Sequence, residues 1–501
     1  MESRLSGILL HITSLPGPFG IGDLGPSAYD FVNFLSRSGQ RLWSILPVNE
    51  ILVHEDACPY CPASAFAGNP LLISPEALVK SGLLKADDLE SYPQVRDGFV
   101  EIEKVIEGKS TLLRKAFANF CYSAGDEDRR AFECFKNGTD WLPEYVHYAQ
   151  QRAITFDVYQ KKPELGSKPQ EKPFAEDDFV SFTQYIFFQQ WKVLREYANA
   201  QGIFLAGDIS FYVSLDSSDV RGQPHLFGID PATGMMTTES GAPPDEFQRK
   251  GQFWRTPIYN WPVHAEDGFK WWRMRIAANT RLYDTFRLDH FRGFESFWSI
   301  PTGSNSPKDG HFMKGPGKPF LDAIKECAGD AQMFVEDLGF ITEEVNALRE
   351  MSDLPGMSVL QLAFNGPGVH PYLPYNCIPD CVMYTSTHDL SPMSGWYNDL
   401  DGKKKTKVQD YVGVPITHEN VHWEFNRLAL ASVAKWVLIP VQDLLGLGGE
   451  ARLNIPGMRS ENHILWRLSN MKGLEEIGQP LVKLTKTYGR WSECGLEATG
   501  I

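Results

Sequence analysis

Eight short apolar segments, rich in β-branched and aromatic residues, recur along this chain of 501 residues. They constrain its fold more than any other feature. They cover residues 7–13, 41–47, 202–210, 284–290, 332–339, 358–364, 381–389 and 436–443. Several are apolar almost throughout, which is typical of strands covered on both faces. Amphipathic segments with helical spacing, such as 27–39 and 320–330, lie between them. Eight strands alternating with helices predict an α/β fold, a parallel (β/α)8 TIM barrel.

Two intervals between the predicted strands are too long for simple crossovers. We expect residues 48–201, after the second strand, to form a helical insertion in which "SKPQEKPFAEDD" is an exposed loop. Residues 211–283, after the third strand, are expected to form a second insertion that includes a loop at 241–261. Residues 1–501 are therefore predicted to form a single barrel domain with both insertions at the C-terminal face.

The charge and the apolar segments of the chain restrict its partners. A net charge of -15 argues against nucleic acid and anionic membranes, because both require a basic surface. No apolar segment approaches the length of a membrane span, and the first residues lack the apolar core of a signal peptide. We expect a cytoplasmic protein with a neutral ligand. The 13 Trp, 18 Tyr and 31 Phe residues are mostly core, but such rings also stack on sugars.

Two close pairs of cysteines stand out among the eight in the chain: Cys58 and Cys61 in "CPYC", and Cys377 and Cys381 in "CIPDC". A zinc site is one interpretation, and for the first pair a redox dithiol is another. The pairs lie far apart, lack the repeated spacing of a zinc ribbon, and "CPYC" does not open a clear helix after a strand. We expect buried thiols and no metal.

Acidic residues end five of the predicted strands, at the end where barrel enzymes build their active sites. They are Asp208, Asp289, Glu336, Asp389 and Asp443. A single aspartate there often caps the next helix, but several that converge on one barrel mouth indicate chemistry. The sequence has no phosphate loop and no dinucleotide fingerprint. Cleavage of a glycosidic bond is the reaction class that needs only carboxylates.

The segment "FRLDHF" and the context of Glu336 suggest different catalytic roles for two of these acids. Arg287 and Asp289 share one face of a strand, so we expect the arginine to lower the pKa of Asp289 and keep it an ionised nucleophile. Glu336 follows two apolar residues, so we expect a raised pKa and the role of general acid. The alternative is an Arg–Asp pair that serves only the core, with helix-capping acids at the other strands.

Ordered sequence blocks extend this interpretation over almost the whole chain. They include "LLHITSLPGPFGIGDLG", "SAFAGNP", "FRLDHFRGF", "VEDLG", "YTSTHD" and "DLLGLGGEARLNIPG". In this order the blocks resemble those of the 4-α-glucanotransferases, also called amylomaltases, of the α-amylase clan. The resemblance implies a retaining (β/α)8 enzyme that moves α-1,4-glucan segments from a donor to the 4-hydroxyl of glucose or another glucan. It implies malto-oligosaccharides as partners and no metal or organic cofactor.

The resemblance also implies roles for individual residues. Asp289 matches the nucleophile that forms a covalent glucosyl-enzyme, and Glu336 matches the general acid/base. Asp389 matches the third carboxylate, which binds sugar hydroxyls. Sugar contacts are implied for Tyr60, Asp208, Phe247, Trp254, Arg287, His388 and Asn454. Phe247 and Trp254 match the loop that borders the acceptor and excludes water.

Some positions depart from the family pattern. Cys58 and Cys61 flank Tyr60 where the family commonly has Ser and Gln, Glu246 replaces a Tyr, and Leu390 replaces an Asn. Two alternatives to a transferase follow. The first is an α-glucan hydrolase, in which water reaches the intermediate before a sugar does. The second is a glucan-binding protein with a decayed site, which the presence of all three acids argues against.

Overall fold

An eight-stranded parallel sheet forms the centre of the molecule, in a computed structural model that describes residues 4–52, 58–152, 178–244, 249–366, 370–456 and 465–491. Its strands are β1 (Leu5–Leu9), β2 (Leu42–Ser44), β3 (Phe204–Ile209), β6 (Thr285–Leu288), β9 (Gln332–Val335), β10 (Gly356–Val359), β11 (Cys381–Tyr384) and β12 (Trp436–Pro440). Each predicted segment supplies one strand. The order is β10-β11-β12-β1-β2-β3-β6-β9. The amide of Val335 donates to the carbonyl of Pro355 at 2.9 Å, which joins the two edges, and the predicted barrel is confirmed.

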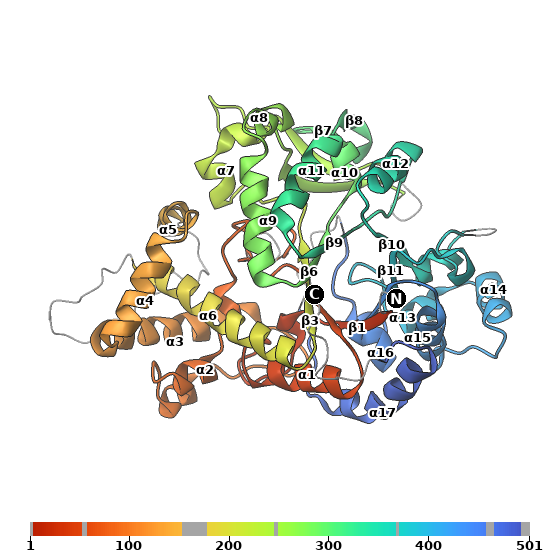
Figure 1. The fold of residues 1–501 in the computed structure, drawn as a ribbon, viewed down its shortest axis with the longest axis horizontal. Coiled ribbons are helices and arrows are strands. Elements are labelled where there is room, and N and C mark those ends of the chain that lie inside the picture. Colours follow the sequence, from red (N-terminus) through yellow and green to blue (C-terminus); the bar gives the residue numbers. More distant parts are fainter. Residues whose placement is uncertain are drawn as a thin grey trace.

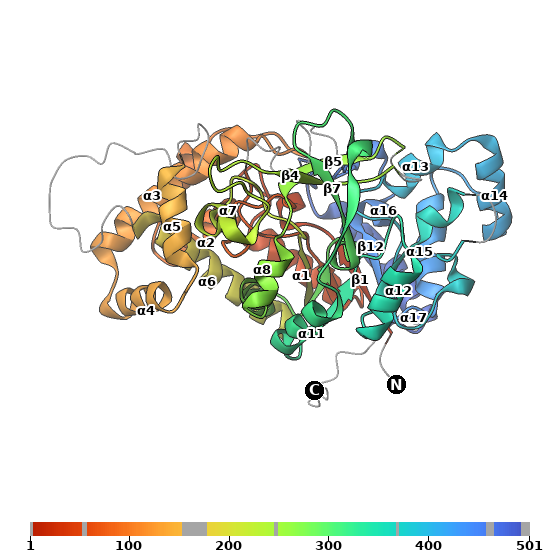
Figure 2. The same ribbon diagram turned by 90° about the horizontal axis from the view of Figure 1, so that it is seen from above.

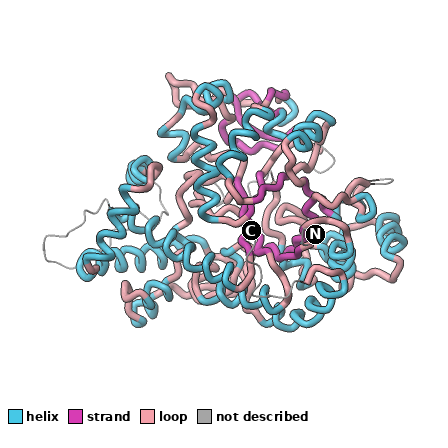
Figure 3. The backbone as a smooth tube through the Cα atoms, viewed as in Figure 1, coloured by secondary structure: helices cyan, strands magenta, loops and turns pink. Residues whose placement is uncertain are grey.

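Helices surround this ring of strands, as Figures 1 and 3 show. They are α1 (Pro26–Arg37), α6 (Asp178–Ala200), α9 (Lys270–Leu282), α11 (Gly317–Ala328), α12 (Glu343–Met351), α15 (Val421–Ala431) and α17 (Lys472–Thr487). In α1, Pro26 occupies the first turn, where its missing N–H costs nothing, and Ala28, Phe31 and Leu35 are buried along one face. The apolar spacing of the sequence therefore directs the helix onto the barrel.

The strands end earlier than predicted, and this places the acids on loops. β6 ends at Leu288, because His290 has a φ of 47°, a left-handed conformation that a strand residue does not adopt. Asp289 is therefore the first residue after β6. β11 ends at Tyr384, so Asp389 lies further along the following loop.

The interval between β2 and α6 contains further helices, which lie on one side of the barrel in Figure 1. They are α2 (Pro75–Lys80), α3 (Ile102–Ser123), α4 (Asp126–Asn137) and α5 (Leu142–Gln151). Phe120, Phe132 and Phe182 pack together between α3, α4 and α6, with ring centroids 5.2–6.5 Å apart. The predicted loop at 167–178 lies outside the described residues, except that Asp178 begins α6.

A second, antiparallel sheet with the order β5-β4-β7-β8 was not expected. It consists of β4 (Thr238–Ala242), β5 (Gln252–Pro257), β7 (Ser296–Pro301) and β8 (His311–Lys314), and Figure 2 shows β4, β5 and β7 on the side away from the chain termini. The segment 241–261, expected as a loop, thus contains β5. The remaining helices are α7 (Ser218–Gly222), α8 (Trp261–Glu266), α10 (Arg292–Glu295), α13 (Met393–Asp399), α14 (Gly402–Val412) and α16 (Val441–Leu445). Within the described part of the chain, no helix has the length and apolarity to cross a membrane.

Candidate active site

A cavity of about 540 Å³ is lined by three of the five predicted acids and by much of the second sheet. Of the residues predicted from the sequence, it is lined by Tyr60, Trp254, Asp289, Glu336, Asp389 and Asn454. Asp208, Arg287 and His388 line a small adjoining cavity. Phe247 lies outside the described residues. Nine of the ten predicted site residues thus meet at one place. Asp208, Arg287 and Trp254 lie within β3, β6 and β5, and the other six lie on segments that follow β2, β6, β9, β11 and β12.

Arg287 connects three of the acids. It lies opposite Asp208 in the register of β6 and β3, and it donates to both carboxylate oxygens of Asp208, at 2.9 and 2.7 Å. It also donates to Oδ1 of Asp289 at 3.0 Å, and its Nη1 lies 3.6 Å from Oε2 of Glu336. Burial opposes its charge, but the carboxylates, Asp208 first, raise the pKa of Arg287 well above its ordinary value. A buried cation therefore organises the negative charge of the site.

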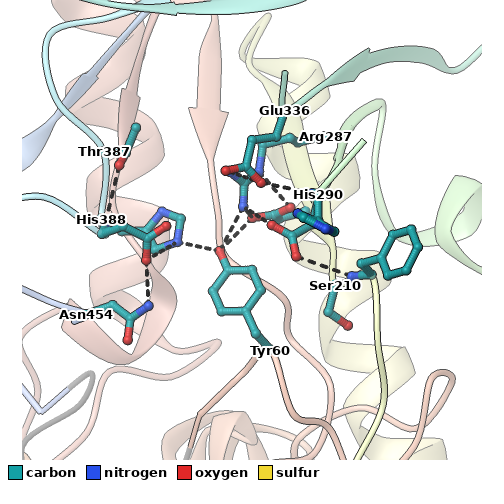
Figure 4. Close-up of polar contacts among 12 residues, drawn as sticks. Tyr60, Ser210, Arg287, His290, Glu336, Thr387, His388 and Asn454 are labelled. Atoms are coloured by element: carbon teal, nitrogen blue, oxygen red, sulfur yellow. Dashed lines mark hydrogen bonds and ion pairs between the residues drawn. The ribbon is translucent and has the colours of Figure 1, made fainter. Parts of the chain in front are cut away.

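The hydroxyl of Tyr60 lies at the centre of a second group of contacts (Figure 4). It donates to Oδ2 of Asp208 at 2.7 Å and accepts from Arg287 at 3.2 Å. Nε2 of His388 lies 2.7 Å away, and the two rings stack with centroids 5.2 Å apart and an interplanar angle of 8°. Burial and the charge of Asp208 raise the pKa of Tyr60, so the hydroxyl keeps its proton and remains a donor.

Asp289 and Glu336 are hydrogen-bonded to each other, so the protonation of one affects the pKa of the other. The amide of Phe211 donates to Asp289 at 3.3 Å, and the amide of His290 donates to Glu336 at 2.9 Å. Burial and the charge of Glu336 raise the pKa of Asp289 well above its ordinary value. Burial opposes ionisation of Glu336 too, but Arg287, Asp289 and the His290 amide lower its pKa to about 2.

Both expected pKa directions are therefore wrong in this structure. Arg287 lowers the pKa of Asp289 less than burial and the neighbouring charges raise it, because the same guanidinium also pairs with Asp208 and Glu336. The Glu336 carboxylate does not lie among its apolar sequence neighbours, since it faces Arg287 and a backbone amide. The two pKa values are nevertheless shifted in opposite directions, which is the separation that a nucleophile and a general acid require.

The third acid, Asp389, is held by the loop after β12. The Asn454 side chain donates to its Oδ1 at 2.5 Å, and Nε2 of His388 lies 3.3 Å from the same oxygen. The amide of Asn454 donates to the carbonyl of His388 at 3.0 Å, and Arg452 donates to the carbonyl of Asp389. Burial lowers the pKa of His388, so its ring is neutral at pH 7. These contacts fix the carboxylate at the cavity wall.

Asp443, the fifth strand-end acid, does not line the cavity. It is fully buried, and it accepts hydrogen bonds from Thr385 at 2.7 Å, Ser386 at 2.5 Å and the amide of Met393 at 2.7 Å. The expectation that it joins the other acids at the barrel mouth is wrong. From within α16 it anchors the start of the loop that carries Asp389 and the first residue of α13, which is a structural role.

Trp254 forms part of the cavity wall from β5. Its ring meets that of His290 edge to face, with centroids 4.7 Å apart and an interplanar angle of 88°. Sequence reasoning missed the part played by His290, whose amide binds Glu336 while its ring supports Trp254. It also missed the amide of Phe211, because a backbone donor leaves no signature in the sequence.

The two cysteine pairs occupy different places. Cys58 and Cys61 line the cavity, whereas the thiols of Cys377 and Cys381 lie 3.0 Å apart at the start of β11. Among the residues that the structure describes, no cluster of three or more His, Cys, Asp or Glu side chains has an arrangement that could hold a metal ion.

Comparison with known proteins decides the family. Residues 10–472 match the family model described as 4-alpha-glucanotransferase. The chain belongs to this family. The family's curated members include the 4-alpha-glucanotransferase of Aquifex aeolicus (strain VF5), 40% identical over 499 residues that cover 97% of this chain and 99% of the relative. That of Streptococcus pneumoniae serotype 4 is 39% identical over 507 residues, with 98% and 99% covered.

Solved structures of 4-alpha-glucanotransferases show the same architecture. The amylomaltase from Streptococcus agalactiae, in complex with acarbose, superposes with a TM-score of 0.88 at 31% identity, covering 98% of this chain and all of that one. The amylomaltase from Corynebacterium glutamicum superposes with a TM-score of 0.77 at 18% identity, which shows a shared fold. Family membership therefore agrees with the barrel and with the resemblance found in the sequence.

Removal of the Tyr60 hydroxyl tests whether its hydrogen bonds position the site. In Tyr60→Phe the ring still stacks on His388, but Asp208 loses a donor and Arg287 loses an acceptor. We expect kcat/KM for maltotriose to fall about 10- to 100-fold, since a buried charged group loses a hydrogen bond. Steady-state kinetics measure this loss. Wild-type kinetics in a folded variant would mean that the hydroxyl does not position the site.

The raised pKa of Asp289 predicts a dependence of stability on pH. The folded protein binds this proton more tightly than the unfolded chain, so the free energy of unfolding decreases as the pH rises above the ordinary pKa of an aspartate. Asp289→Asn lacks this penalty. We expect its melting temperature to exceed that of the wild type at pH 7, and the difference to shrink toward about pH 4. Calorimetry at both pH values tests this, and a difference independent of pH would contradict it.

Proposed function

We propose that this protein transfers α-1,4-glucan segments from a donor to the 4-hydroxyl of glucose or another glucan, through a covalent glucosyl-enzyme. The observation that carries the proposal is the placement of Asp289 and Glu336 beside the buried Arg287, 3.0 and 3.6 Å from its guanidinium, in a cavity that Asp389 also lines. Retaining glycoside chemistry needs one ionised and one protonated carboxyl group on opposite sides of the scissile bond.

The first step forms the intermediate. With donor bound, one proton resides on Glu336, which is hydrogen-bonded to Asp289, so the transfer requires no other group. The Asp289 carboxylate attacks the anomeric carbon, and the bond from that carbon to the glycosidic oxygen breaks. Glu336 donates its proton to the departing oxygen, which leaves as a free 4-hydroxyl.

The second step reverses the roles. The 4-hydroxyl of the acceptor attacks the anomeric carbon and gives its proton to Glu336, and the bond to Asp289 breaks. One α-1,4 bond has been lost and another formed, and the carboxyl pair again holds one proton. The two carboxyl groups and the acceptor hydroxyl supply every proton and electron pair, so the proposal includes no metal or organic cofactor.

The other residues bind and orient the sugar. We assign Asp389, His388 and Asn454 to the hydroxyl groups of the donor glucose, because their polar atoms form one connected group at the cavity wall. Tyr60, with Asp208 beneath it, supports that wall. Trp254, together with Phe247 on the neighbouring segment, is assigned to the acceptor side, where it excludes water.

Malto-oligosaccharides are the proposed substrates. The aromatic side chains in the cavity wall suit them, because such rings stack on sugars, and a relative with the same fold is described in complex with acarbose. Phe211, Tyr212, Trp254, Trp298, Phe312 and Phe340 contribute aromatic surface to this wall. A cytoplasmic location, expected from the sequence, is part of the proposal.

A time course with maltotriose tests the proposed function. Products are resolved by size, and free glucose and total reducing ends are assayed in parallel. Transfer predicts glucose together with a ladder of longer oligomers, at a constant total of reducing ends. Rising reducing ends with only shorter products would show that water, instead of sugar, receives the glucan, and the protein would then be a hydrolase.

A further inference from the structure

The turn that carries Tyr60 presents two thiols to the cavity, and the proposed reaction uses neither. Cys58 and Cys61 line the cavity and are both partly exposed. The amide of Cys61 donates to the carbonyl of Cys58 at 3.1 Å, which closes a four-residue turn with Pro59 and Tyr60 at its centre. The two thiols are hydrogen-bonded to each other.

This geometry suits a covalent link between the two sulfur atoms. A turn closed by a hydrogen bond from its fourth to its first residue brings the outer Cα atoms within about 7 Å. Disulfides join Cα atoms about 4.4 to 6.8 Å apart, so the turn already has the required span. Since the thiols contact each other, the bond needs only a small closing movement.

Cys58 is the better nucleophile. Its hydrogen bond with Cys61 lowers its pKa, and the backbone at Tyr60 adds to this effect, against the opposing effect of burial. The thiolate is the reactive form of cysteine, and a thiol with a lowered pKa reached from a cavity is the kind that oxidants modify first.

We propose that Cys58 and Cys61 form a modification site, at which a peroxide converts the two thiols into a disulfide that spans Tyr60. In the first step the Cys58 thiolate attacks a peroxide oxygen, the O–O bond breaks, and the leaving hydroxide takes up a proton to become water. The sulfenic acid that forms on Cys58 is then attacked by the sulfur of Cys61. The S–O bond breaks, and the oxygen leaves as a second water with the proton of Cys61. Two thiols lose two electrons, and hydrogen peroxide accepts them.

The disulfide acts on the site through Tyr60. The tyrosine hydroxyl holds its contacts to Asp208, Arg287 and His388 at 2.7–3.2 Å, which is a narrow range. A covalent bond draws the two ends of the turn together and displaces the residue between them. We expect turnover of maltotriose to fall about 10-fold or more, because small displacements of a positioning group are costly. This second part rests on the proposed function, whereas the formation of the disulfide does not.

The other cysteine pair provides a matched control. Cys377 and Cys381 also place two thiols in contact, at 3.0 Å, but Cys381 begins β11 and therefore lies at the end of the barrel opposite the cavity. A disulfide there has no route to Tyr60. The variant Cys377→Ser/Cys381→Ser removes this competing reaction, and we expect it to retain wild-type turnover.

The experiment treats this double variant with hydrogen peroxide and maps the thiols by mass spectrometry after digestion. We expect the peptide containing residues 58–61 to lose the mass of two hydrogen atoms and turnover to fall in parallel, with dithiothreitol restoring both. Adding Cys61→Ser is expected to leave an oxygen adduct on Cys58 and no disulfide. The proposal is overturned if Cys58 and Cys61 stay reduced or gain only oxygen, or if the disulfide forms with unchanged turnover. The mass measurement needs no transfer activity, so it stands even if the proposed function fails.

Discussion

Asp289→Asn is expected to lower turnover of maltotriose by about 10⁴-fold or more, because the variant lacks the atom that forms the glycosyl bond. The asparagine occupies nearly the same volume, and its single acceptor oxygen keeps one of the two hydrogen bonds that the amide of Phe211 and Arg287 donate to separate oxygens of Asp289. The loss is therefore expected in kcat, with the fold intact. Single-turnover and steady-state assays with maltotriose measure it, and circular dichroism verifies the fold.

Asp443→Asn provides the matched control for this variant. Both residues are acids that follow barrel strands within three positions, but Asp443 is fully buried and accepts hydrogen bonds from Thr385, Ser386 and Met393, outside the cavity. We expect the control to lose stability and to keep most of its turnover at a temperature at which it remains folded. Near-normal turnover in Asp289→Asn, or an equal loss of turnover in both variants, would remove Asp289 from the role of nucleophile.

Arg287→Met is expected to damage both stability and activity. The substitution leaves the carboxylates of Asp208, Asp289 and Glu336 near one another without their cation. Removal of one partner from a buried ion pair costs about 3–5 kcal/mol, so we expect a large fall in the melting temperature. The protonation of these acids relieves their repulsion, so the deficit should shrink as the pH falls from 7 toward about 4. Thermal unfolding across this range tests the expectation.

Arg195→Met is the control for Arg287→Met, because it shows whether removing another ion-paired arginine lowers stability and activity to the same extent. Arg195 pairs with Asp284 at 2.7 Å, just before β6, where both side chains are partly exposed. We expect a smaller loss of stability and unchanged chemistry, because this pair lies at the other end of the strand. An Arg287→Met variant that melts like the wild type would show that Arg287 does not compensate the buried negative charge.

The barrel was predictable because its strands are covered on both faces and read as continuous apolar segments. The second sheet was not. β8 has the sequence "HFMK", in which the two apolar residues are adjacent and do not alternate with polar ones. β4 has the sequence "TESGA", which has little strand propensity. β4 forms because it pairs with β5 and β7, and β8 forms because it pairs with β7. Local sequence patterns do not reveal pairing between segments that are separated along the chain.

The acids were predictable as residues but not as electrostatic states. Asp289, Glu336 and Asp389 follow strands of one parallel barrel, and the topology therefore brings them together. The pKa directions of Asp289 and Glu336 depend on how Arg287 divides its contacts among three carboxylates, and the sequence contains no information on these distances. Asp443 was misassigned because β12 ends at Pro440, so the residue lies within α16 and its carboxylate contacts Thr385, Ser386 and Met393.

The most direct test of the proposed mechanism is a mass measurement on Glu336→Gln incubated with α-maltotriosyl fluoride. Fluoride leaves without the proton of a general acid, and glutamine cannot activate the acceptor, so the glycosyl-enzyme should accumulate. We predict a protein heavier by one maltotriosyl group, attached to the peptide that contains Asp289. The absence of a covalent adduct, or its attachment to another residue, would contradict the double displacement through Asp289.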